Sequence, residues 1–574
     1  MTTFTENELL ADKGYPGFSP ELVSENVYFG AARQLSAEDL DRFWLLEYRW
    51  PNGFCPLGLT YVELCLTWAN QYAAQHAPLP PADGYDNRIV GTSVYGTERP
   101  SASAFAFASR DIRLTQRMPG FIRGFDAFWN TEKEALLRSA QVIERTELEG
   151  RTLAGLDGYL TDCVHYMRWT WERHFEIMYL MLLNHAGFYR LCEQLGINKE
   201  LAGQMFGGRK TKISEGDAAI WALTDAIREA GAEAHFAGGP LDAAATRAAL
   251  ASGTAAERAL DGRIGAFLDE WGWRTEIIGD PLSAPWIEDA TPLFGHLRNN
   301  LASGKSFDLD SRVAKAREDS EAAIEAVRAR LSTPERAEFD KGLEANRAAS
   351  FVWWNEDHNF YIDQRTAIPL RRAALAIGRA LDLAEAEDTC FLFLPELRQL
   401  ARGEKTWRDF GSLVRDRRDY YTHWKGQRVR MPKFIGTPPD RFVDPILTEL
   451  DGMSEEFLAR LGQSEAKTEL KGVAASPGTA RGRVRIVRNA EDLHQLEKDD
   501  VLVCEGTSPS WTAAFTRIAA CLADQGGTLS HAAIVSREYR LPCIVALAKA
   551  TTTFANGDEV IVDGDKGTVR RVQP

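Results

Sequence analysis

Residues 523–545, ADQGGTLSHAAIVSREYRLPCIV, decide the fold of the C-terminal part of this chain. A glycine pair, Gly526 and Gly527, precedes a Ser-His pair, Ser530 and His531, which opens an apolar run with helical spacing. A short apolar strand follows Pro542. Glycines, hydroxyls and a nucleophile at a strand-to-helix turn predict a site for phosphate. There the free N–H groups and the positive end of the helix dipole attract anions.

Strands and short helices alternate around this stretch, from residue 471 to residue 574. The turn sequences Asn556-Gly557-Asp558 and Asp563-Gly564-Asp565 separate the last strands. The pattern predicts a small α/β domain at 471–574. The expected strands are 481–487, 501–504, 521–523, 543–546, 559–562 and 568–572, with helices at 491–497 and 510–519.

The larger part of the chain, 1–450, has a helical pattern from residue 36 onward, with proline- and glycine-rich breaks at 77–98 and 278–292. Thr333, followed by a proline and a glutamate, predicts the start of one helix. A charged stretch at 451–470 predicts a short helix and a linker. The fold class expected is therefore a large, mostly α-helical domain followed by a small α/β domain. The amphipathic runs are 36–50, 131–148, 155–195, 215–230, 241–269 and 346–385.

Composition limits the class of protein. The chain has 574 residues, 44% hydrophobic and 26% charged, which is typical of a multidomain globular protein. A net charge of −15 argues against general binding to nucleic acid or an anionic membrane surface. The eight scattered cysteines predict buried, reduced thiols, and the N-terminus does not look like a signal peptide. We therefore expect a cytoplasmic protein with no membrane partner.

The stretch 523–545 resembles the phosphohistidine segment of the phosphoenolpyruvate-utilising (dikinase-type) superfamily, whose usual form is GGxxSHAAIVARExGIPAVV. Segments 471–487, 500–515 and 556–570 resemble the family's swivelling domain in the same order. The resemblance implies that His531 is the phosphohistidine. It also implies that the phosphate is cradled by Gly526, Gly527, Thr528 and Ser530. Leu529 stands where some dikinases have a regulatory threonine, so that form of regulation is not expected.

An imidazole suits this role, because it is substantially neutral at pH 7 and offers a lone pair to phosphorus. An isolated Ser-His pair would more often only cap a helix. The long match around His531 favours the phosphohistidine.

The helical part resembles phosphoenolpyruvate-synthase-like phosphotransferases, including the phosphohistidine subunit of phenylphosphate synthase and the acceptor-side domains of rifampin phosphotransferase. The segments concerned are 43–58, 267–289 and 353–378, where WGWR departs from the more usual YGHR. On a continuous helix, His358 would share a face with Tyr361 and Arg365, which suggests an acceptor pocket with His358 as base. The alternative is that His358 only packs in an aromatic cluster.

Two components of such systems are not recognised in the sequence: an ATP-grasp domain and a phosphoenolpyruvate-binding barrel. We therefore expect His531 to receive its phosphoryl group from a separate ATP-grasp subunit, which would bind ATP and Mg²⁺ or Mn²⁺. No metal ligands are assigned in this chain. The segment from Gly462 to Lys471 could span roughly 30 Å when extended, enough for a shuttle.

The leading hypothesis is the phosphohistidine-bearing subunit of a two-component ATP-dependent phosphotransferase. Domain 1–450 would bind a hydroxyl acceptor, best guessed as a phenol or hydroxylated aromatic, and the swivelling domain 471–574 would deliver the phosphoryl group. One alternative is the same relay to a non-aromatic alcohol, an antibiotic or a small acid. Another is a phosphocarrier or regulatory protein with no small-molecule acceptor.

Overall fold

The structure is a computed structural model that describes residues 3–19, 22, 34–76, 82–101, 103–238, 241–304, 306–462 and 469–572. It divides into two compact units. Unit 1 comprises Met1–Leu180, Ile277–Ala284 and Tyr361–Asp440. Unit 2 comprises Met181–Glu276, Pro285–Phe360 and Arg441–Pro574. These units group segments by contact, and the predicted boundaries at 450 and 470 stay a prediction.

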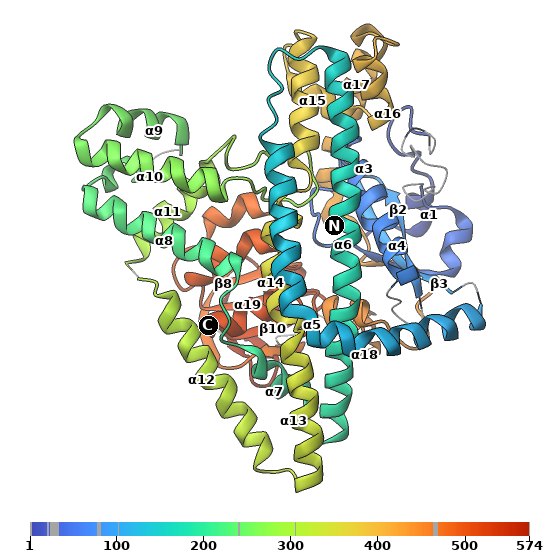
Figure 1. The fold of residues 1–574 in the computed structure, drawn as a ribbon, viewed down its shortest axis with the longest axis vertical. Helices are drawn as coiled ribbons and strands as arrows, with labels where there is room; N and C mark the ends of the chain where they lie inside the picture. Colours follow the sequence, from blue (N-terminus) through green and yellow to red (C-terminus); the bar gives the residue numbers. More distant parts are fainter. Residues whose placement is uncertain are drawn as a thin grey trace. The chain divides into compact units, whose positions relative to one another are not determined.

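Unit 1 is built mainly of helices. The long helix α5 (Ala104–Glu144) turns back into α6 (Leu153–Gln194), and the two run side by side (Figure 1). The Tyr159 hydroxyl donates to the Ile143 carbonyl at 2.8 Å across this turn. The other helices are α1 (Glu6–Leu10), η1 (Ala37–Asp41), α3 (Leu59–Tyr61), η2 (Val62–Ala69), α4 (Asn70–His76), η5 (Asp363–Arg365), α15 (Ile368–Ala380), η6 (Ala386–Phe391), α16 (Leu394–Ala401), α17 (Trp407–Gln427) and η7 (Arg428–Arg430).

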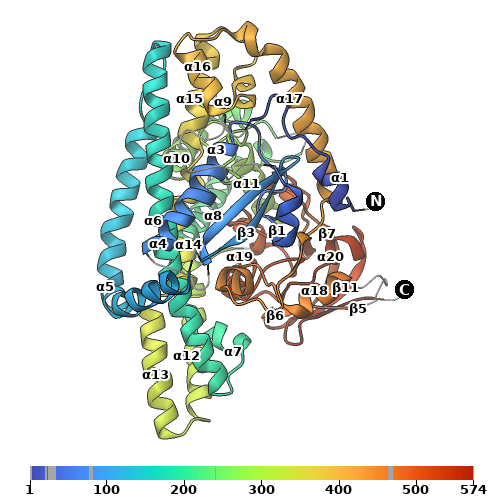
Figure 2. The ribbon, with the colours of Figure 1, turned by 90° about the vertical axis from the view of Figure 1, so that its right-hand side faces the viewer.

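A four-stranded antiparallel sheet in unit 1 corrects the expectation of helix throughout 36–450. Its order is β2-β3-β1-β4, with β1 (Phe43–Leu46), β2 (Ala82–Val90), β3 (Ser93–Pro100) and β4 (Phe434–Gly436) (Figure 2). The stretch expected as a break contains a hairpin, in which Val90 pairs with Ser93 across a two-residue turn. Gly91 adopts φ +60° there, a conformation that favours glycine and tightens a hairpin.

The helical part of unit 2 confirms the expected helical character of the larger region. Glu335 caps the helix predicted near Thr333, but the N-cap is Ser332, one residue earlier. The helices are α7 (Lys199–Gly203), η3 (Gln204–Phe206), α8 (Lys212–Ala230), η4 (Glu233–His235), α9 (Ala243–Ser252), α10 (Ala255–Trp271), α11 (Thr291–Ser303), α12 (Leu309–Arg328), α13 (Thr333–Ala348), α14 (Phe351–Tyr361), η8 (Ile446–Leu450) and α18 (Glu455–Gly462).

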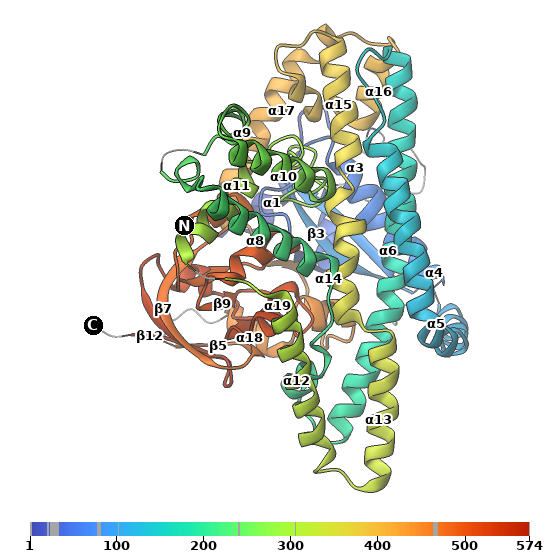
Figure 3. The ribbon, with the colours of Figure 1, turned by 60° about the vertical axis from the view of Figure 1, so that its left-hand side comes forward.

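The C-terminal part of unit 2 is the expected α/β domain. Its eight-stranded sheet has the order β5-β12-β11-β7-β8-β9-β10-β6, and the central run β7-β8-β9-β10 is parallel. The strands are β5 (Glu469–Lys471), β6 (Val473–Ser476), β7 (Thr479–Ile486), β8 (Val501–Cys504), β9 (Ala520–Ala523), β10 (Cys543–Val545), β11 (Glu559–Asp563) and β12 (Thr568–Arg571). The helices are η9 (Ala490–Gln495), η10 (Pro509–Thr516), α19 (His531–Tyr539) and α20 (Ala550–Thr553), and α19 lies beside α12 (Figure 3).

Both faces of the central strands are buried. Successive residues of β8 point to opposite sides, so Leu502 and Cys504 join one apolar cluster while Val501 and Val503 join another. Strands covered on both faces read as continuous apolar runs, which is why β8 and β9 were predictable.

The remaining expectations have mixed outcomes. All eight cysteines lie in the described part of the chain, where they are buried and form no disulfide, as expected. The short helix predicted after residue 451 is α18, whereas residues 463–468 of the predicted linker lie outside the described residues. No helix in the described part of the chain combines the length and the apolar character needed to cross a bilayer.

Candidate active site

His531 is the first residue of α19, directly after the turn that follows β9. Ser530 is the N-cap, and its hydroxyl accepts a hydrogen bond from the Ala533 N–H at 3.4 Å. The histidine therefore stands at the carboxyl edge of the parallel strands, at the positive end of a helix, as the sequence predicted.

Two hydroxyls contact the imidazole of His531. Thr507 Oγ1 lies 2.8 Å from Nδ1, and Thr512 Oγ1 lies 3.1 Å from Nε2. The ring of Phe515 meets the imidazole edge-on, with centroids 6.1 Å apart. All three side chains come from the connection between β8 and β9, so the α/β domain itself fixes the ring.

The imidazole is 7% exposed, and this burial lowers the pKa of His531 to about 3. In this arrangement the ring is therefore neutral at pH 7, and one nitrogen keeps a free lone pair.

A carboxylate from the helical part lies opposite His531. Glu356 on α14 places Oε2 3.9 Å from His531 Nε2, and its side chain is 1% exposed. Burial raises the pKa of Glu356 well above its usual range, and the charge of Glu538 raises it further. A carboxylate with a raised pKa is a stronger base than an exposed one.

Further acids surround this contact. Asp217 on α8 accepts a hydrogen bond from the Tyr539 hydroxyl at 2.6 Å. Burial raises the pKa of Asp217 to about 6, although Tyr539, Arg274 and Arg312 oppose the shift. Burial likewise raises the pKa of Glu538 to about 7, against the opposing charge of Arg537. The face of α19 that meets the helices is thus polar and titratable.

The predicted phosphate cradle has other partners in this structure. The N–H groups of Gly526 and Gly527 donate to the carbonyls of Asp451 and Leu450, at 3.0 and 2.8 Å. Thr528 Oγ1 donates to Glu449 Oε2 at 2.8 Å. A Cβ at Gly527 would lie 2.3 Å from the Glu449 carbonyl oxygen, so this approach by itself requires glycine. A role of Gly526, Gly527, Thr528 and Ser530 in holding phosphate stays a prediction.

The predicted continuous helix at 346–385 is wrong. It is interrupted after α13 and again at Ile362, where φ −122° and ψ −69° are not helical. His358 stacks on Trp354 with ring centroids 4.1 Å apart, and its Nδ1 lies 3.0 Å from the Trp354 carbonyl oxygen.

The two residues predicted to accompany His358 belong to unit 1 and have their own contacts there. Arg365 pairs with Glu144 at 2.7 Å, and Tyr361 meets Trp129 edge-on at 6.0 Å. A pocket formed by His358, Tyr361 and Arg365 therefore stays a prediction, and these contacts are those of packed core residues.

Sequence reasoning missed Thr507 and Thr512 and did not assign Glu356 a role. A signal for Thr507 was present: it follows β8, His531 follows the neighbouring β9, and parallel strands end at the same edge of a sheet. Glu356 had no such signal, because its proximity to His531 depends on long-range docking.

Together, the sheet and the histidine at its carboxyl edge form the small α/β domain that the sequence predicted. Residues 496–567 match the PEP-utilising enzyme mobile domain, and residues 173–356 match the rifampicin phosphotransferase fourth domain. These two segments of the chain are therefore similar to domains of PEP-utilising enzymes and of rifampicin phosphotransferases.

Three curated relatives extend this comparison. The chain is 30% identical over 507 residues to chondramide synthase cmdD of Chondromyces crocatus, covering 84% of this chain and 13% of that protein. It is 27% identical over 560 residues to the uncharacterized phosphotransferase YvkC of Bacillus subtilis, and the match covers 92% of this chain and 62% of that protein. It is 27% identical over 330 residues to the rifampicin phosphotransferase of Streptomyces sviceus, and the match covers 56% of this chain and 35% of that protein. The chain thus spans less than two thirds of the length of each relative.

Proposed function

We propose that this chain is the phosphohistidine-bearing component of an ATP-dependent phosphotransferase, in which His531 carries the phosphoryl group to a hydroxyl acceptor. The observation that carries the proposal is the buried pair of His531 Nε2 and Glu356 Oε2, 3.9 Å apart. A nucleophile and a base that face each other from two parts of the chain fit a shuttle that meets its acceptor on docking. The match to the mobile domain supports the same function.

The donor is an ATP-grasp domain on a separate polypeptide, which binds ATP with Mg²⁺ or Mn²⁺. ATP, water and the acceptor alcohol give AMP, inorganic phosphate and the phosphorylated acceptor. In the first half, His531 Nε2 forms a bond to the β-phosphorus as the bond from that phosphorus to the oxygen of AMP breaks, and AMP leaves. Water then takes the terminal phosphoryl group as inorganic phosphate, and the β-phosphoryl group stays on His531. Nε2 is the nitrogen that faces Glu356. Attack by Nε2 requires that Nδ1 carries the ring proton and donates it to Thr507 Oγ1, and that Nε2 gives up its contact with the Thr512 hydroxyl, which donates to the Pro509 carbonyl.

In the second half, the acceptor oxygen attacks phosphorus and the N–P bond breaks, returning its electron pair to Nε2. Glu356 takes the acceptor proton as general base. Burial raises the pKa of Glu356, which faces His531, whereas His358, the base suggested by the sequence, stacks on Trp354.

One experiment tests both halves. The chain is incubated with a candidate ATP-grasp partner, Mg²⁺ and β-labelled ATP. Label is expected on the wild type but not on His531→Ala. Glu356→Gln is expected to take up label normally and to discharge it to the acceptor about 10²- to 10⁴-fold more slowly, the usual contribution of a general base. Equal label on wild type and His531→Ala would overturn the relay, and normal discharge by Glu356→Gln would remove the assigned base.

The acceptor proposed first is a phenol or hydroxylated aromatic, following the resemblance to phenylphosphate synthase. A second candidate, a hydroxyl of an antibiotic such as rifampicin, is favoured by the match of 173–356, which ends at Glu356. Discharge of the labelled chain by phenol and by rifampicin separates the two. Discharge only to another protein would favour a phosphocarrier.

A further inference from the structure

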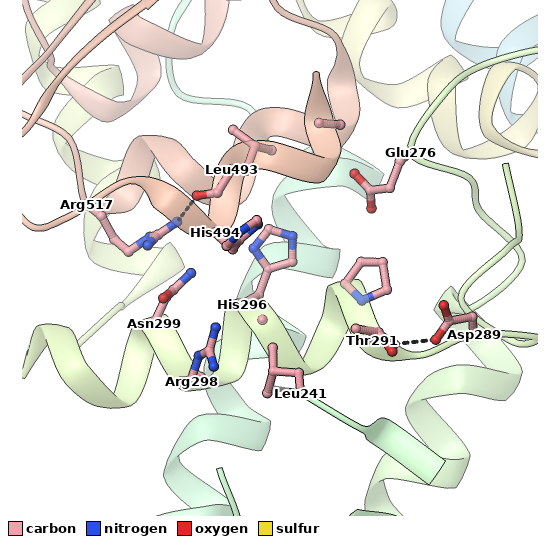
Figure 4. A pocket seen from close by; sticks show the side chains of 13 residues that line it. Leu241, Glu276, Asp289, Thr291, His296, Arg298, Asn299, Leu493, His494 and Arg517 are labelled. Carbon is pink, nitrogen blue, oxygen red and sulfur yellow. Dashed lines mark hydrogen bonds between the residues drawn. The ribbon is translucent and has the colours of Figure 1, made fainter. Parts of the chain in front are cut away.

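A cavity of about 620 Å³ lies in unit 2, away from the active site. One wall comes from α11 and the segment before it, and the other from the α/β domain around η9 and η10 (Figure 4). His531 and Glu356 are not among its lining residues, so this is not where the phosphoryl group is delivered. The lining residues are Leu241, Glu276, Asp289, Thr291, Pro292, Gly295, His296, Arg298, Asn299, Ala490, Leu493, His494 and Arg517.

Charge is divided across the cavity. Arg517, Asn299 and Arg298 lie on one side of His296, and Glu276 and Asp289 lie on the other (Figure 4). The acids are already engaged: Asp289 Oδ1 accepts from the Thr291 N–H at 2.9 Å, and Glu276 Oε1 accepts from Trp286 Nε1 at 2.7 Å. The arginines give the other side of the cavity a positive charge, which attracts an anion.

Arg517 is buried, with 3% of its surface exposed. Nη1 and Nη2 donate to the carbonyls of Leu496 and Leu493 at 3.1 and 3.4 Å, while Nε has no partner among the described residues. Burial lowers the pKa of Arg517 to about 10, so the guanidinium stays charged at neutral pH. A buried cation with an unused donor favours an anion.

His296 gives an independent indication of a ligand. Its side chain is 6% exposed and lines the cavity, and neither ring nitrogen has a hydrogen bond within the described residues. Its ring lies beside Trp286, with centroids 5.7 Å apart. Because the residue lines the cavity, its ring nitrogens are available to a ligand atom there. Burial and the charges of Arg517 and Arg274 lower its pKa to about 3, and a bound anion would raise it.

We propose that this cavity binds a small organic anion, with a carboxylate or phosphate held by Arg517, Arg298 and His296. The apolar body of the ligand lies against Leu241, Pro292, Ala490 and Leu493. Since the walls come from residues 241–299 and 490–517, the ligand bridges the helical part and the α/β domain. Binding therefore stabilises the docked arrangement, in which Ser510 also donates to the Glu276 carbonyl at 2.9 Å. The site is an effector site, separate from phosphoryl transfer.

The test uses the full chain and three probes of similar size: benzoate, benzyl phosphate and the uncharged benzyl alcohol. Calorimetry is expected to detect benzoate, benzyl phosphate or both, and at least tenfold weaker binding of benzyl alcohol. Arg298→Gln and His296→Gln are each expected to weaken anion binding at least tenfold. Arg336→Gln, which changes an exposed arginine on α13 outside the cavity, is the matched control and should bind as wild type does.

The results show whether the cavity binds an anion and whether the charged group of the ligand is a phosphate or a carboxylate. Preference for benzyl phosphate indicates a phosphate ester, and preference for benzoate indicates a carboxylic acid. A rise in the pKa of His296 on binding, followed by NMR, would place the anion beside the ring. Equal affinity for benzyl alcohol, or unchanged anion binding in both cavity variants, would overturn the proposal. Neither result would bear on the labelling of His531.

Discussion

The interior of the α/β domain and the face by which α19 meets the helices differ in polarity. The interior consists of two apolar clusters on either side of the sheet, with fully buried residues such as Leu502 and Leu522. The α19 face carries His531, Glu538 and Tyr539, opposite Glu356 and Asp217. The interior holds apolar side chains and buried thiols, whereas the α19 face gathers carboxyl groups, an imidazole and a phenol.

This difference is what the proposed swivelling motion of the α/β domain would require. A domain that leaves its docking partner must keep its own core, so that core should be apolar and complete. A docking face that separates in every cycle should instead be polar, because exposing it to water costs little. Each prediction below separates the two surfaces by experiment.

The largest effect is expected in the core. Leu522→Ala, in β9, removes a side chain with no exposed surface and should lower the local unfolding free energy by about 2–5 kcal/mol. Native-state hydrogen exchange in β8 and β9 measures this loss. Tyr539→Phe on the α19 face should leave exchange in these strands unchanged. An equal loss of protection in both variants would show that core and docking face form one unit.

Docking should depend on pH, with its strength falling as the pH rises from 5 to 7. In this structure burial raises the pKa values of Asp217 and Glu538 from 3.8 and 4.5 to about 6 and 7. If undocking exposes both acids, the docked state holds more protons, and it loses this advantage as they ionise. His531 acts in the opposite direction, because its pKa falls from 6.5 to about 3. The two acids, with Glu356, outweigh it, and the docking constant should fall by about tenfold or more.

A dye pair on Lys498→Cys and Glu338→Cys, both exposed and both in unit 2, reports docking. The native cysteines are buried and should not compete for label. The double variant Asp217→Asn with Glu538→Gln is the control. In this variant the docking constant should fall much less between pH 5 and pH 7 than in the wild type. Docking that strengthens with pH would mean that His531, rather than the acids, dominates the face.

The sequence predicted the core far better than the docking face. The apolar runs at Val501–Cys504 and at Ala520–Ala523 specify buried parallel strands through local pattern alone. The position of His531 at the head of a helix was also readable from Ser530 and the glycines. The proximity of Glu356 was not readable, because 174 residues of intervening chain must fold and dock before the two side chains meet.

The four-stranded sheet of unit 1 was missed for a related reason. The pairing of β1 with β4 joins Trp44 to Ile435, and strands of three or four residues carry too little periodicity to be recognised. The position of β1 in the sheet therefore depends on its pairing with β4, which lies nearly 400 residues later in the chain. The hairpin around Gly91 was predicted as a break because the glycines and prolines of 77–98 were taken as signs of a loop. The β-branched residues of the same stretch, which favour strands, were not considered.

The hydroxyl of Thr507 should matter for chemistry and not for docking. Thr507→Val keeps the shape of the side chain but removes the contact 2.8 Å from His531 Nδ1, so the ring tautomer is no longer fixed. Labelling of His531 is expected to slow about tenfold, close to the value of a lost hydrogen bond. Thr507→Ser should restore the rate. The signal of the dye pair should be the same in the wild type and in both Thr507 variants. A change in this signal would mean that Thr507 contributes to docking.

The smallest expected effect is that of Tyr539→Phe, and it measures the docking face directly. The variant removes the hydroxyl that donates to Asp217 Oδ2 at 2.6 Å, a loss of about 0.5–1.5 kcal/mol, or roughly two- to tenfold in docking. Because docking buries His531, weaker docking should speed its phosphorylation by the small donor phosphoramidate by the same factor. Tyr72→Phe on α4 is the matched control and should change neither reading. A faster reaction without a change in the dye signal would mean that His531 is reached while docked, so that burial alone does not guard the phosphoryl group.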